Sequence, residues 1–371
     1  MDLIKFVPGA DPTLLEKGRS INNWKSVMWV ERYLNPGEFE IQAPLSTGLR
    51  DFLPLGTLMS HLNTLEVMIV ENHQIVDDQN DPTLSITGRS LDSYLENRIV
   101  GQNLARTASA VTDYVLPAAI TSTQAVKLIN DHIRTASGVV DTNDALTNVE
   151  GHTFITTISG GPIEARTIDR AEVSGKLIEI LKIDDLGIQS LRRSSFTVDV
   201  PLEAATLLRV YKGADKTKTI HFAWYSGDFD KVEYLFSQKA LKTSAMVVGR
   251  WAWTIVDLGP AKYNRRMMLI DASDLDEKLT AMPAGGALTT LIAKLQVRGR
   301  QVLKSQQQIA ITGADVANTA SYIYRKDYNL GDLVRLDGNY GQTLTMRVVE
   351  YAEIEDENGR SGHPTLAIPG V

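Results

Sequence analysis

Six histidines are the side chains of this 371-residue chain best suited to act as general bases or metal ligands. No two have the spacing that places two ligands on one helix face, and no Gly-x-Ser-x-Gly turn exposes a serine nucleophile. We therefore expect these histidines to be structural or solvated. They are His61, His73, His132, His152, His221 and His363.

Two short segments superficially resemble the end of a phosphate-binding loop. Gly213-Ala214-Asp215-Lys216-Thr217 lacks the first glycine and the Gly-Lys-Ser/Thr ending whose backbone amides wrap phosphates. Ser174-Gly175-Lys176 lies inside an amphipathic pattern and has no upstream glycine. We predict a loop between strands for the first segment and a helix for the second.

Carboxylates offer a further route to chemistry. The acidic run Asp77 to Asp81 has oxygen ligands for Ca²⁺ but lacks the spacing and distal glutamate of an EF-hand, so a polar turn is favoured. Paired carboxylates for glycoside hydrolysis stay open, because any two of the 45 acids could meet in space. Trp251 and Trp253 alternate along one strand, where they could form a carbohydrate platform. Packing in a barrel core is the favoured interpretation.

Composition narrows the class of protein. The chain is 43% hydrophobic and 22% charged, which is typical of globular proteins. It has no cysteine, so disulfides, thiol catalysis and zinc-thiolate sites are excluded. A net charge of -7 argues against attraction of nucleic acid by the overall field, and the runs at Lys212 to Lys218 and Arg265–Arg266 are interpreted as solvated loops. We expect no metal and no cofactor.

The N-terminus and the apolar runs argue against membrane targeting. Met1 to Phe6 has an acid at position two and no apolar core, so we expect no signal peptide. Runs such as Val67 to Val70 are too short to span a bilayer.

Turn chemistry divides the first hundred residues into strands. Asn35-Pro36-Gly37 separates the aromatic segment 24–33 from the alternating segment 38–41, which predicts a hairpin. Further strands are predicted over 64–70 and 83–87.

The spacing of the apolar residues then changes to the period of a helix. Ser90 is a candidate N-cap for a helix that carries Leu91, Tyr94, Leu95 and Ile99. A second helix is predicted over about 124–134. Asp169 and Glu172 form a capping-box pattern before the stripe Val173, Leu177, Ile180 and Leu181, and Gly187 is the predicted C-terminal stop.

Strand patterns return after residue 194. They cover 195–200, 206–211, 219–225, 231–236 and 245–256. Another helix fits Leu288, Leu291, Ile292, Leu295 and Val302, and the last fifty residues predict strands with turns at Asp337-Gly338 and Asn358-Gly359. This order favours a mainly β chain with α insertions (α+β) over a parallel α/β sheet.

Four separated stretches together carry a family pattern. They are Ile21 to Ile41, which includes Trp29-Val30-Glu31-Arg32-Tyr33 and Pro36-Gly37-Glu38-Phe39; Ile86 to Ile99, with Gly88-Arg89-Ser90-Leu91; Arg265 to Leu275; and Asp327 to Val334, with Tyr328-Asn329-Leu330-Gly331-Asp332.

In this order the stretches resemble the Gp37-like tail proteins of siphophages of Gram-positive bacteria. These proteins are relatives of the tail-tip hub, the N-terminal module of tail-associated lysins, and of the baseplate hubs of contractile phages. The resemblance spans most of the chain and is weakest over about 100–260. The positions that carry it are Trp29, Arg32, Tyr33, Pro36, Gly37, Phe39, Gly88, Arg89, Leu91, Arg98, Arg265, Asp271, Tyr328, Leu330, Gly331 and Asp332.

The resemblance implies two similar β-barrels per subunit and partly helical inserted domains. We predict a first barrel over 1–118, a mostly helical insert over 119–194, and a second barrel over 195–371 that contains a helical insert at about 259–305. It further implies a non-enzymatic homotrimer whose six barrels form a pseudo-sixfold symmetry adaptor.

The implied partners are the other components of a phage tail tip. A distal tail protein ring or the tail tube is expected above the trimer, and a tip, fibre or receptor-binding protein below it. The tape-measure protein and transiting DNA are expected in the lumen during ejection. The expected location is the virion, after assembly in the host cytoplasm.

Two alternatives remain at this stage. A distal tail or tube ring protein belongs to the same structural class but forms hexamers. A carbohydrate-binding or carbohydrate-cleaving β-protein requires an exposed aromatic platform beside a carboxylate pair.

Overall fold

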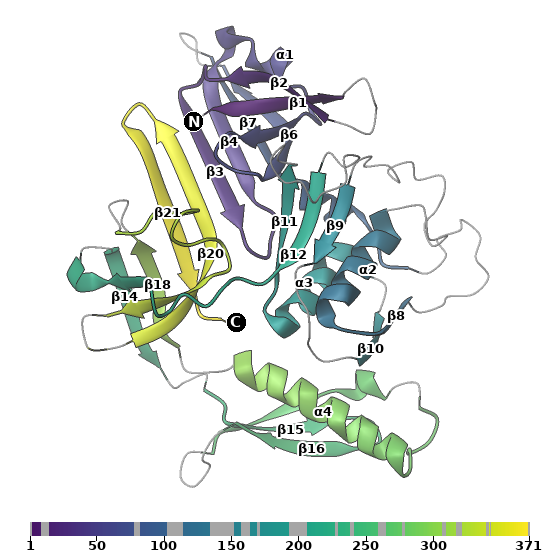
Figure 1. The fold of residues 1–371 in the computed structure, drawn as a ribbon. Helices are drawn as coiled ribbons and strands as arrows, with labels where there is room; N and C mark the ends of the chain where they lie inside the picture. The colour runs from purple at the N-terminus through teal and green to yellow at the C-terminus, as the bar shows by residue number, and fades with distance from the viewer. Residues whose placement is uncertain are drawn as a thin grey trace, which may run out of the picture. The chain divides into compact units, whose positions relative to one another are not determined.

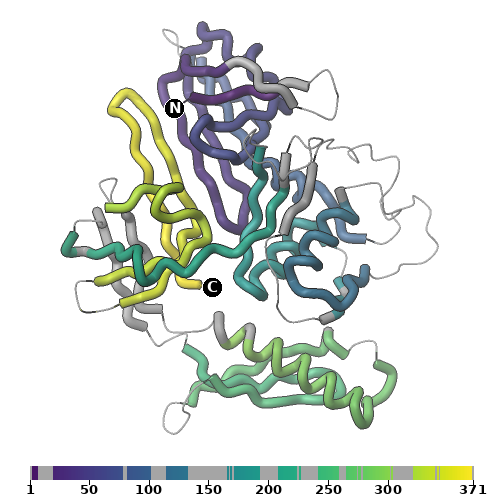
Figure 2. The backbone as a smooth tube through the Cα atoms, viewed as in Figure 1, coloured from purple at the N-terminus to yellow at the C-terminus, as the bar shows by residue number. Residues whose placement is uncertain are grey.

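The fold was analysed in a computed structural model (Figure 1). It describes residues 2–8, 15–77, 82–101, 114–133, 152–156, 164–168, 171–192, 206–226, 229–237, 241–258, 265–276, 279–305, 309–316, 321–338, 341 and 343–369 (Figure 2). The chain divides into two compact units: unit 1 comprises Met1–Asp230 and Asp315–Pro369, and unit 2 comprises Lys231–Ala314 with Gly370–Val371.

A curved antiparallel sheet forms the larger part of unit 1. Its order is β21-β20-β3-β4-β7-β6-β5-β1-β2. The predicted hairpin over the Asn35-Pro36-Gly37 turn is confirmed as β3 (Ser26–Arg32) and β4 (Glu38–Pro44). The remaining N-terminal strands are β1 (Leu3–Pro8), β2 (Leu15–Ile21), β5 (Leu58–His61), β6 (Val67–Val76) and β7 (Thr83–Ser90), and η1 (Leu45–Thr47) and α1 (Leu49–Phe52) follow β4.

The last strands of the chain complete the sheet begun by the first. The central strand β20 (Thr343–Asp356) pairs with β3 along residues 350–355, and with β21 (Gly359–Ala367) across the Asn358-Gly359 turn. Gly359 has φ +116°, which a glycine adopts without strain. The other end of β20 pairs with β19 (Leu333–Asp337), which also pairs with β13 (His221–Ala223). A short η5 (Trp224–Ser226) follows β13.

Alternating side chains explain why this sheet forms. In β7 every second residue is buried, and β4 shows nearly the same alternation. The inward side chains form one apolar core around Trp29, Phe39, Ile41, Leu84 and Ile86.

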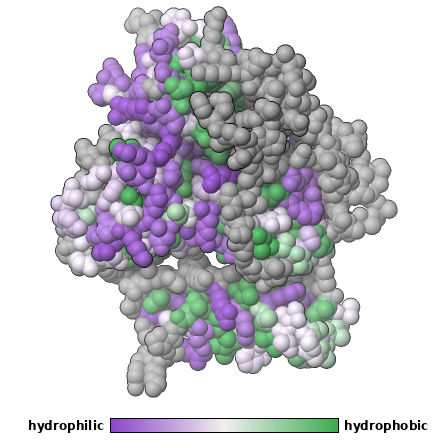
Figure 3. Space-filling model, viewed as in Figure 1, coloured by the Kyte–Doolittle hydropathy of each residue, from purple (hydrophilic) through white to green (hydrophobic). Residues whose placement is uncertain are grey.

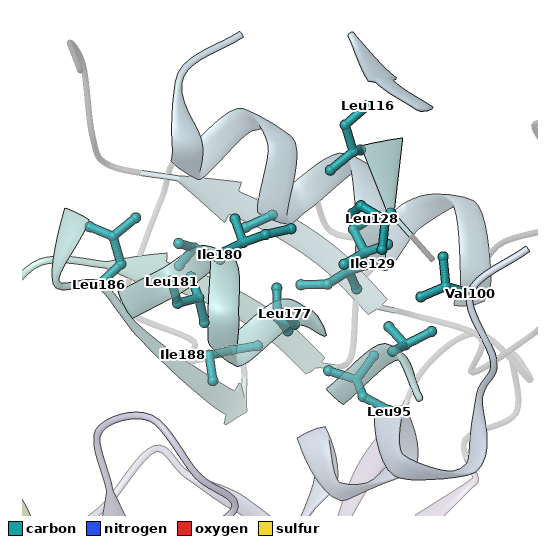
Figure 4. Packing of buried hydrophobic residues seen from close by; sticks show 14 of the residues in the cluster. Leu95, Val100, Leu116, Leu128, Ile129, Leu177, Ile180, Leu181, Leu186 and Ile188 are labelled. Carbon is teal, nitrogen blue, oxygen red and sulfur yellow. The ribbon is translucent and has the colours of Figure 1, made fainter. Parts of the chain in front are cut away.

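Helices gather around a second core in unit 1 (Figure 4). The predicted stripe of Val173, Leu177, Ile180 and Leu181 is buried there, as expected for α3 (Val173–Asp184). Helix α3 packs on α2 (Thr121–Ile133). The neighbouring elements are η2 (Leu91–Asn97), β8 (Tyr114–Ala119), β10 (Glu164–Ile168) and the sheet β11-β12-β9, made of β11 (Gly187–Arg192), β12 (Thr206–Tyr211) and β9 (His152–Thr156).

Two predicted helix ends differ from the structure in part. Ser90 lies at the predicted N-cap position of η2 but makes no capping bond; its hydroxyl donates to Asp92 and accepts from the Gly37 amide. Helix α3 ends at Asp185 in the left-handed region (φ 62°), whereas Gly187 already belongs to β11. The predicted cap Asp169 and the predicted strand over 195–200 lie outside the described residues.

Unit 2 contains a small sheet covered by one helix. The segment predicted as strand over 245–256 forms two strands, β15 (Ser244–Val248) and β16 (Trp253–Asp257), and β17 (Met267–Asp271) pairs with β15 in parallel. Helix α4 (Gly286–Ser305) confirms the predicted C-terminal helix and packs Leu291, Leu295 and Leu303 on Ala245, Val247, Val256 and Ile270. A short η6 (Ser273–Leu275), β14 (Phe229–Ser237) and β18 (Ile309–Val316) are the other elements of this stretch.

The mainly β fold class with helical insertions is confirmed. Among the described strands no sheet closes into a barrel, so the two-barrel architecture stays a prediction. The domain limits given above stay predictions as well. No helix in the described residues is long and apolar enough to cross a membrane.

Candidate functional site

The first and second family stretches meet inside the unit 1 sheet. Trp29 and Phe39 are cross-strand partners whose rings stack with centroids 5.9 Å apart. Gly88 lies opposite Phe39 on β7, and a Cβ there would stand 1.8 Å from the Ile69 carbonyl oxygen. Glycine is therefore required at this close approach of two backbones. Leu91 is buried directly after the strand.

Arg32 links three segments at the end of β3. Its guanidinium lies 2.6 Å from both Glu38 and Glu350 and donates to the Pro36 carbonyl at 3.1 Å. The hairpin turn is further fixed by Gly37, whose amide donates to the Ser90 hydroxyl at 2.8 Å. Arg32 thus joins the first hairpin to the C-terminal strand β20.

Tyr33 is the centre of a buried cluster that we name the Tyr33 junction, formed with Asp185, Gly187, Gly331 and Arg347. The phenol donates to the Asp185 carbonyl at 2.8 Å, and burial raises the pKa of Tyr33 to about 12, so the hydroxyl keeps its proton. The Arg347 guanidinium lies 5.1 Å from the ring centroid and pairs with the Asp185 carboxylate.

Two glycines make room for the Tyr33 ring. A Cβ on either Gly187 or Gly331 would lie 2.3 Å from a ring carbon. Gly331 also has φ +83°, which disfavours every other residue. Neighbouring Asp332 accepts from the amides of Ala214 at 2.8 Å and Asn329 at 2.9 Å, while Tyr328 and Leu330 are buried. The junction therefore brings the first and fourth family stretches together.

A second buried cluster, the Glu31 network, lies beside this junction. Glu31 is 2% exposed and accepts from Tyr324 at 2.8 Å and from Arg325 at 2.6 Å. Thr64 also donates to Glu31. Arg325 lies 3.8 Å from Glu353, which pairs in turn with Arg360. The Glu31 network ties β3 to β20, β21 and the segment before β19.

His61 and Glu66 are buried close to these charges. Neither ring nitrogen of His61 has a hydrogen-bond partner in the part of the protein described, and burial with nearby Arg325 and Arg360 lowers its pKa to about 3. Burial, together with Glu31 and Asp92, raises the pKa of Glu66. His61 is therefore neutral near pH 7, and burial favours the protonated, neutral form of Glu66, as an interior of low polarity requires.

The other histidines are dispersed. His132 accepts from the Gly101 amide through Nε2, and its Nδ1 lies 2.7 Å from the Leu128 carbonyl oxygen. His73 Nε2 lies 2.7 Å from the Leu53 carbonyl oxygen. In the described ranges no three His, Asp or Glu side chains are grouped as a metal site would require.

The remaining candidate segments lie in ordinary structure. Gly213 to Thr217 forms the predicted loop between strands, with Gly213 against Gly331, and Ser174 to Lys176 lies in α3 as predicted. Most of the acidic run 77–81 lies outside the described residues.

One open hollow of about 570 Å³ lies where β3 begins beside the β20–β21 turn. Trp24 and three successive acids line it together with a lysine and an asparagine. The full lining is Asn22, Trp24, Lys25, Glu355, Asp356 and Glu357.

The third family stretch lies in unit 2. Arg265 donates to the Ser244 hydroxyl at 3.3 Å and approaches Asp257 at 3.5 Å, and Asp271 accepts from the Ser273 amide at 2.9 Å. Arg89 in unit 1 pairs with Glu71 and Glu96, and the Arg98 carbonyl accepts from Val173. These positions hold turns and strand ends. Whether they are the family's defining positions stays a prediction.

The outer face of the unit 2 sheet is apolar and exposed. Trp253 is 59% exposed and Leu269 is 71% exposed, and the register places Ile255 and Leu269 on either side of Met246. The predicted packing of Trp253 in a barrel core is therefore wrong, because α4 covers the opposite face. Trp251 is half-buried and donates to the Leu279 carbonyl at 3.0 Å. Alternation alone does not tell which face of a strand is covered.

A family model describes most of this chain. The model of the Siphovirus ReqiPepy6 Gp37-like protein matches residues 11–366. No curated protein matches the sequence.

Solved structures share the fold over nearly the whole chain. The 43 kDa tail protein of prophage MuSo2 from Shewanella oneidensis is 12% identical with a TM-score of 0.60, covering 100% of this chain and 99% of that one. A tail protein from Neisseria meningitidis MC58 is 10% identical with a TM-score of 0.59, covering 98% and 96%. Prophage tail protein gp18 from Listeria monocytogenes EGD-e is 11% identical with a TM-score of 0.54, covering 99% and 94%.

Proposed function

Because this chain belongs to the siphovirus ReqiPepy6 Gp37-like protein family, we propose that it is a structural subunit of a phage tail, the hub of the tail tip. Three copies form a ring that adapts a hexameric distal tail or tube to a trimeric tip or fibre. Each copy contributes two barrel-like β domains, so that six form the pseudo-sixfold face.

Full-length similarity of fold is the observation that carries this proposal. The three tail proteins are matched over at least 98% of this chain and at least 94% of their own. A shared module alone would match only a part of each chain. The fold along the whole chain is thus shared with proteins described as tail components.

The internal chemistry of the chain fits a structural role. Its buried ionisable groups in the Glu31 network and the Tyr33 junction pair with one another and link distant strands. Such groups fix the packing of the subunit, while exposed faces remain for contacts with other proteins. We propose no catalytic residue and no cofactor.

The proposed partners are the components that surround a hub in the tail tip. The distal tail ring or tube lies above the hub, the tip, fibre or receptor-binding proteins lie below it, and the tape-measure protein and DNA pass through its lumen. The protein resides in the virion after assembly in the host cytoplasm.

Labelling of intact virions tests the proposal. An antibody raised against the chain and marked with gold should bind at the tail end distal to the capsid in negative-stain images. Label distributed along the tail shaft would instead support the tube alternative and overturn the hub proposal.

A carbohydrate-binding role is the second candidate, because Trp253 is exposed on the same strand face as Asp257. The neighbours Ile255 and Leu269 offer no hydrogen bonds to a sugar, which favours a protein contact. Binding of host cell-wall polysaccharide that is lost in Trp253→Ala would support the second candidate.

A further inference from the structure

Charge is segregated between the two units. Residues 231–314 contain twelve Lys and Arg against six Asp and Glu, a formal charge of +6. Since the whole chain carries -7, the remaining residues carry -13. A strong asymmetry of this kind points to an oppositely charged partner.

Helix α4 carries four of the twelve basic residues of unit 2. Its twenty residues contain Lys294, Arg298, Arg300 and Lys304 and no acid. Leu291 and Leu295 are buried against the sheet, while Lys294 and Arg300 are exposed. Figure 3 shows hydrophilic and hydrophobic side chains side by side over the α4 face of this unit. We call the exposed side of α4, with Ala293, Lys294 and Arg300, the basic face.

The basic face acts independently of the overall charge. Exposed charges are screened beyond about 8–10 Å at physiological ionic strength, so the field in contact range of the basic face is set by the charges close to it. A surface in contact with α4 therefore meets a positive potential, although the protein as a whole is acidic.

We propose that the basic face of α4 docks on the acidic unit 1 of a second copy of this chain. This rests on the proposed function in one respect, namely that copies meet within one assembly. Contacts of unit 1 with unit 1, or of unit 2 with unit 2, bring like charges together. A head-to-tail contact pairs opposite charges, and head-to-tail contacts close into rings.

Nucleic acid is the competing polyanion. Phosphates attract basic helices, but the residues outside unit 2 carry -13 on the same chain, which opposes the approach of a polyanion. The charge distribution therefore favours a second copy of the chain as the partner. Each copy supplies one acidic unit 1 for each basic face.

A carbodiimide, which couples an amine directly to a carboxylate, tests the contact in the full-length protein. Copies labelled with ¹⁴N and ¹⁵N are mixed, coupled, digested and analysed by mass spectrometry. We expect mixed-isotope links between Lys294 and acidic peptides of unit 1. Raising the salt from about 0.1 M to about 1 M, which shortens the screening length from about 10 Å to about 3 Å, should reduce these links severalfold.

Two matched variants test whether the mixed-isotope links arise from charge attraction or from chance proximity. Ala293→Glu/Arg300→Glu changes two exposed positions of α4, retains Lys294 as the reporter, and should lose most mixed-isotope links. Lys212→Glu/Lys218→Glu reverses two exposed lysines of unit 1, makes that unit more acidic, and should keep or increase them.

Three outcomes overturn the inference. These are links confined to single copies, mixed-isotope links that persist in the α4 variant, and a lack of such links while a double-stranded DNA oligonucleotide binds at the basic face. None of these three outcomes tests the location of the protein in the virion. Gold label along the shaft would overturn the hub proposal whether or not the links form.

Discussion

At the residue scale, Tyr33 shows how one side chain unites distant parts of unit 1. Gly187 and Gly331 lie 154 and 298 positions further along the chain, and both leave space for its ring. Arg347 covers the ring and satisfies the Asp185 carboxylate. The packing of this cluster therefore requires a glycine at position 331 as much as it requires the tyrosine at position 33.

Substitution of Gly331 by alanine should destabilise the protein strongly. The new Cβ would stand 2.3 Å from the Tyr33 ring, and φ +83° is strained for alanine, so we expect a loss of about 3–4 kcal/mol in the free energy of unfolding. Gly56→Ala is the matched control, because Gly56 has φ +82° but open space around it; it should cost only about 1 kcal/mol. Urea unfolding measures both, and equal losses would contradict the steric argument.

His61 should make folding sensitive to acid. Its pKa is about 3 in the folded chain against 6.5 for an ordinary histidine, so between these values the unfolded chain binds the extra proton. Stability from this group is therefore lost as pH falls, by about 2 kcal/mol between pH 7 and pH 5.

The His61→Leu variant isolates this effect. Burial raises the pKa of Glu66 and Asp92, which gives a pH dependence of opposite sign, so the informative quantity is the difference between wild type and variant. Urea unfolding at pH 7 and pH 5 should show a smaller acid loss for His61→Leu. Identical losses would show that His61 does not titrate as described.

Family resemblance in the sequence singled out Tyr33 and Gly331, but not that they touch. Arg347 falls within the strands predicted for the last fifty residues without any mark of its role. Nothing in the sequence singles out Asp185, because a left-handed aspartate at a helix end has no clear sequence signal. Glycine after a helical stripe was the expected stop, and the structure uses Gly187 for its small size instead.

At the element scale, the Glu31 network joins strands that begin and end the chain. Removing one partner of a buried ion pair leaves the other charge unpaired. Glu31→Gln and Arg325→Met should each cost about 3–5 kcal/mol, while the double variant should cost less than the two together.

The pair Lys176–Glu179 on α3, whose glutamate is exposed, provides the control for this double-mutant cycle. Its coupling should be at most about 0.5 kcal/mol, because solvent screens exposed charges. A coupling between Glu31 and Arg325 as small as this would show that the network contributes little to packing.

The two faces of the unit 2 sheet should respond differently to truncation. Leu295→Ala on α4 opens a cavity in a covered core and should cost about 2–5 kcal/mol. Leu269→Ala on the uncovered face should cost under about 0.5 kcal/mol. Thermal unfolding monitored by circular dichroism compares them, and a large loss for Leu269→Ala would show that the outer face is covered.

Elements with strong periodicity could be predicted from the sequence. The 24–41 hairpin, α3 and α4 appear where their apolar spacing indicated, because each buries one face. Strand pairing could not be predicted. Alternation in β20 fixes which side chains share a face, but not that its neighbour is β3, more than 300 residues away.

At the whole-molecule scale, the chain consists of two units with formal charges of opposite sign. In unit 1 the pairing of β3 with β20 joins the N-terminal and C-terminal strands, and unit 2 is a helix-covered sheet with one apolar face. These features describe a subunit whose remaining surfaces serve assembly, which is the role proposed from the family and the shared fold.

The mass and symmetry of the purified full-length protein test the central claim most directly. Light scattering combined with negative-stain class averages should show a trimeric ring with a central hole and six outer lobes. A stable hexamer would contradict the hub assignment and identify the protein as a ring of the distal tail or tube.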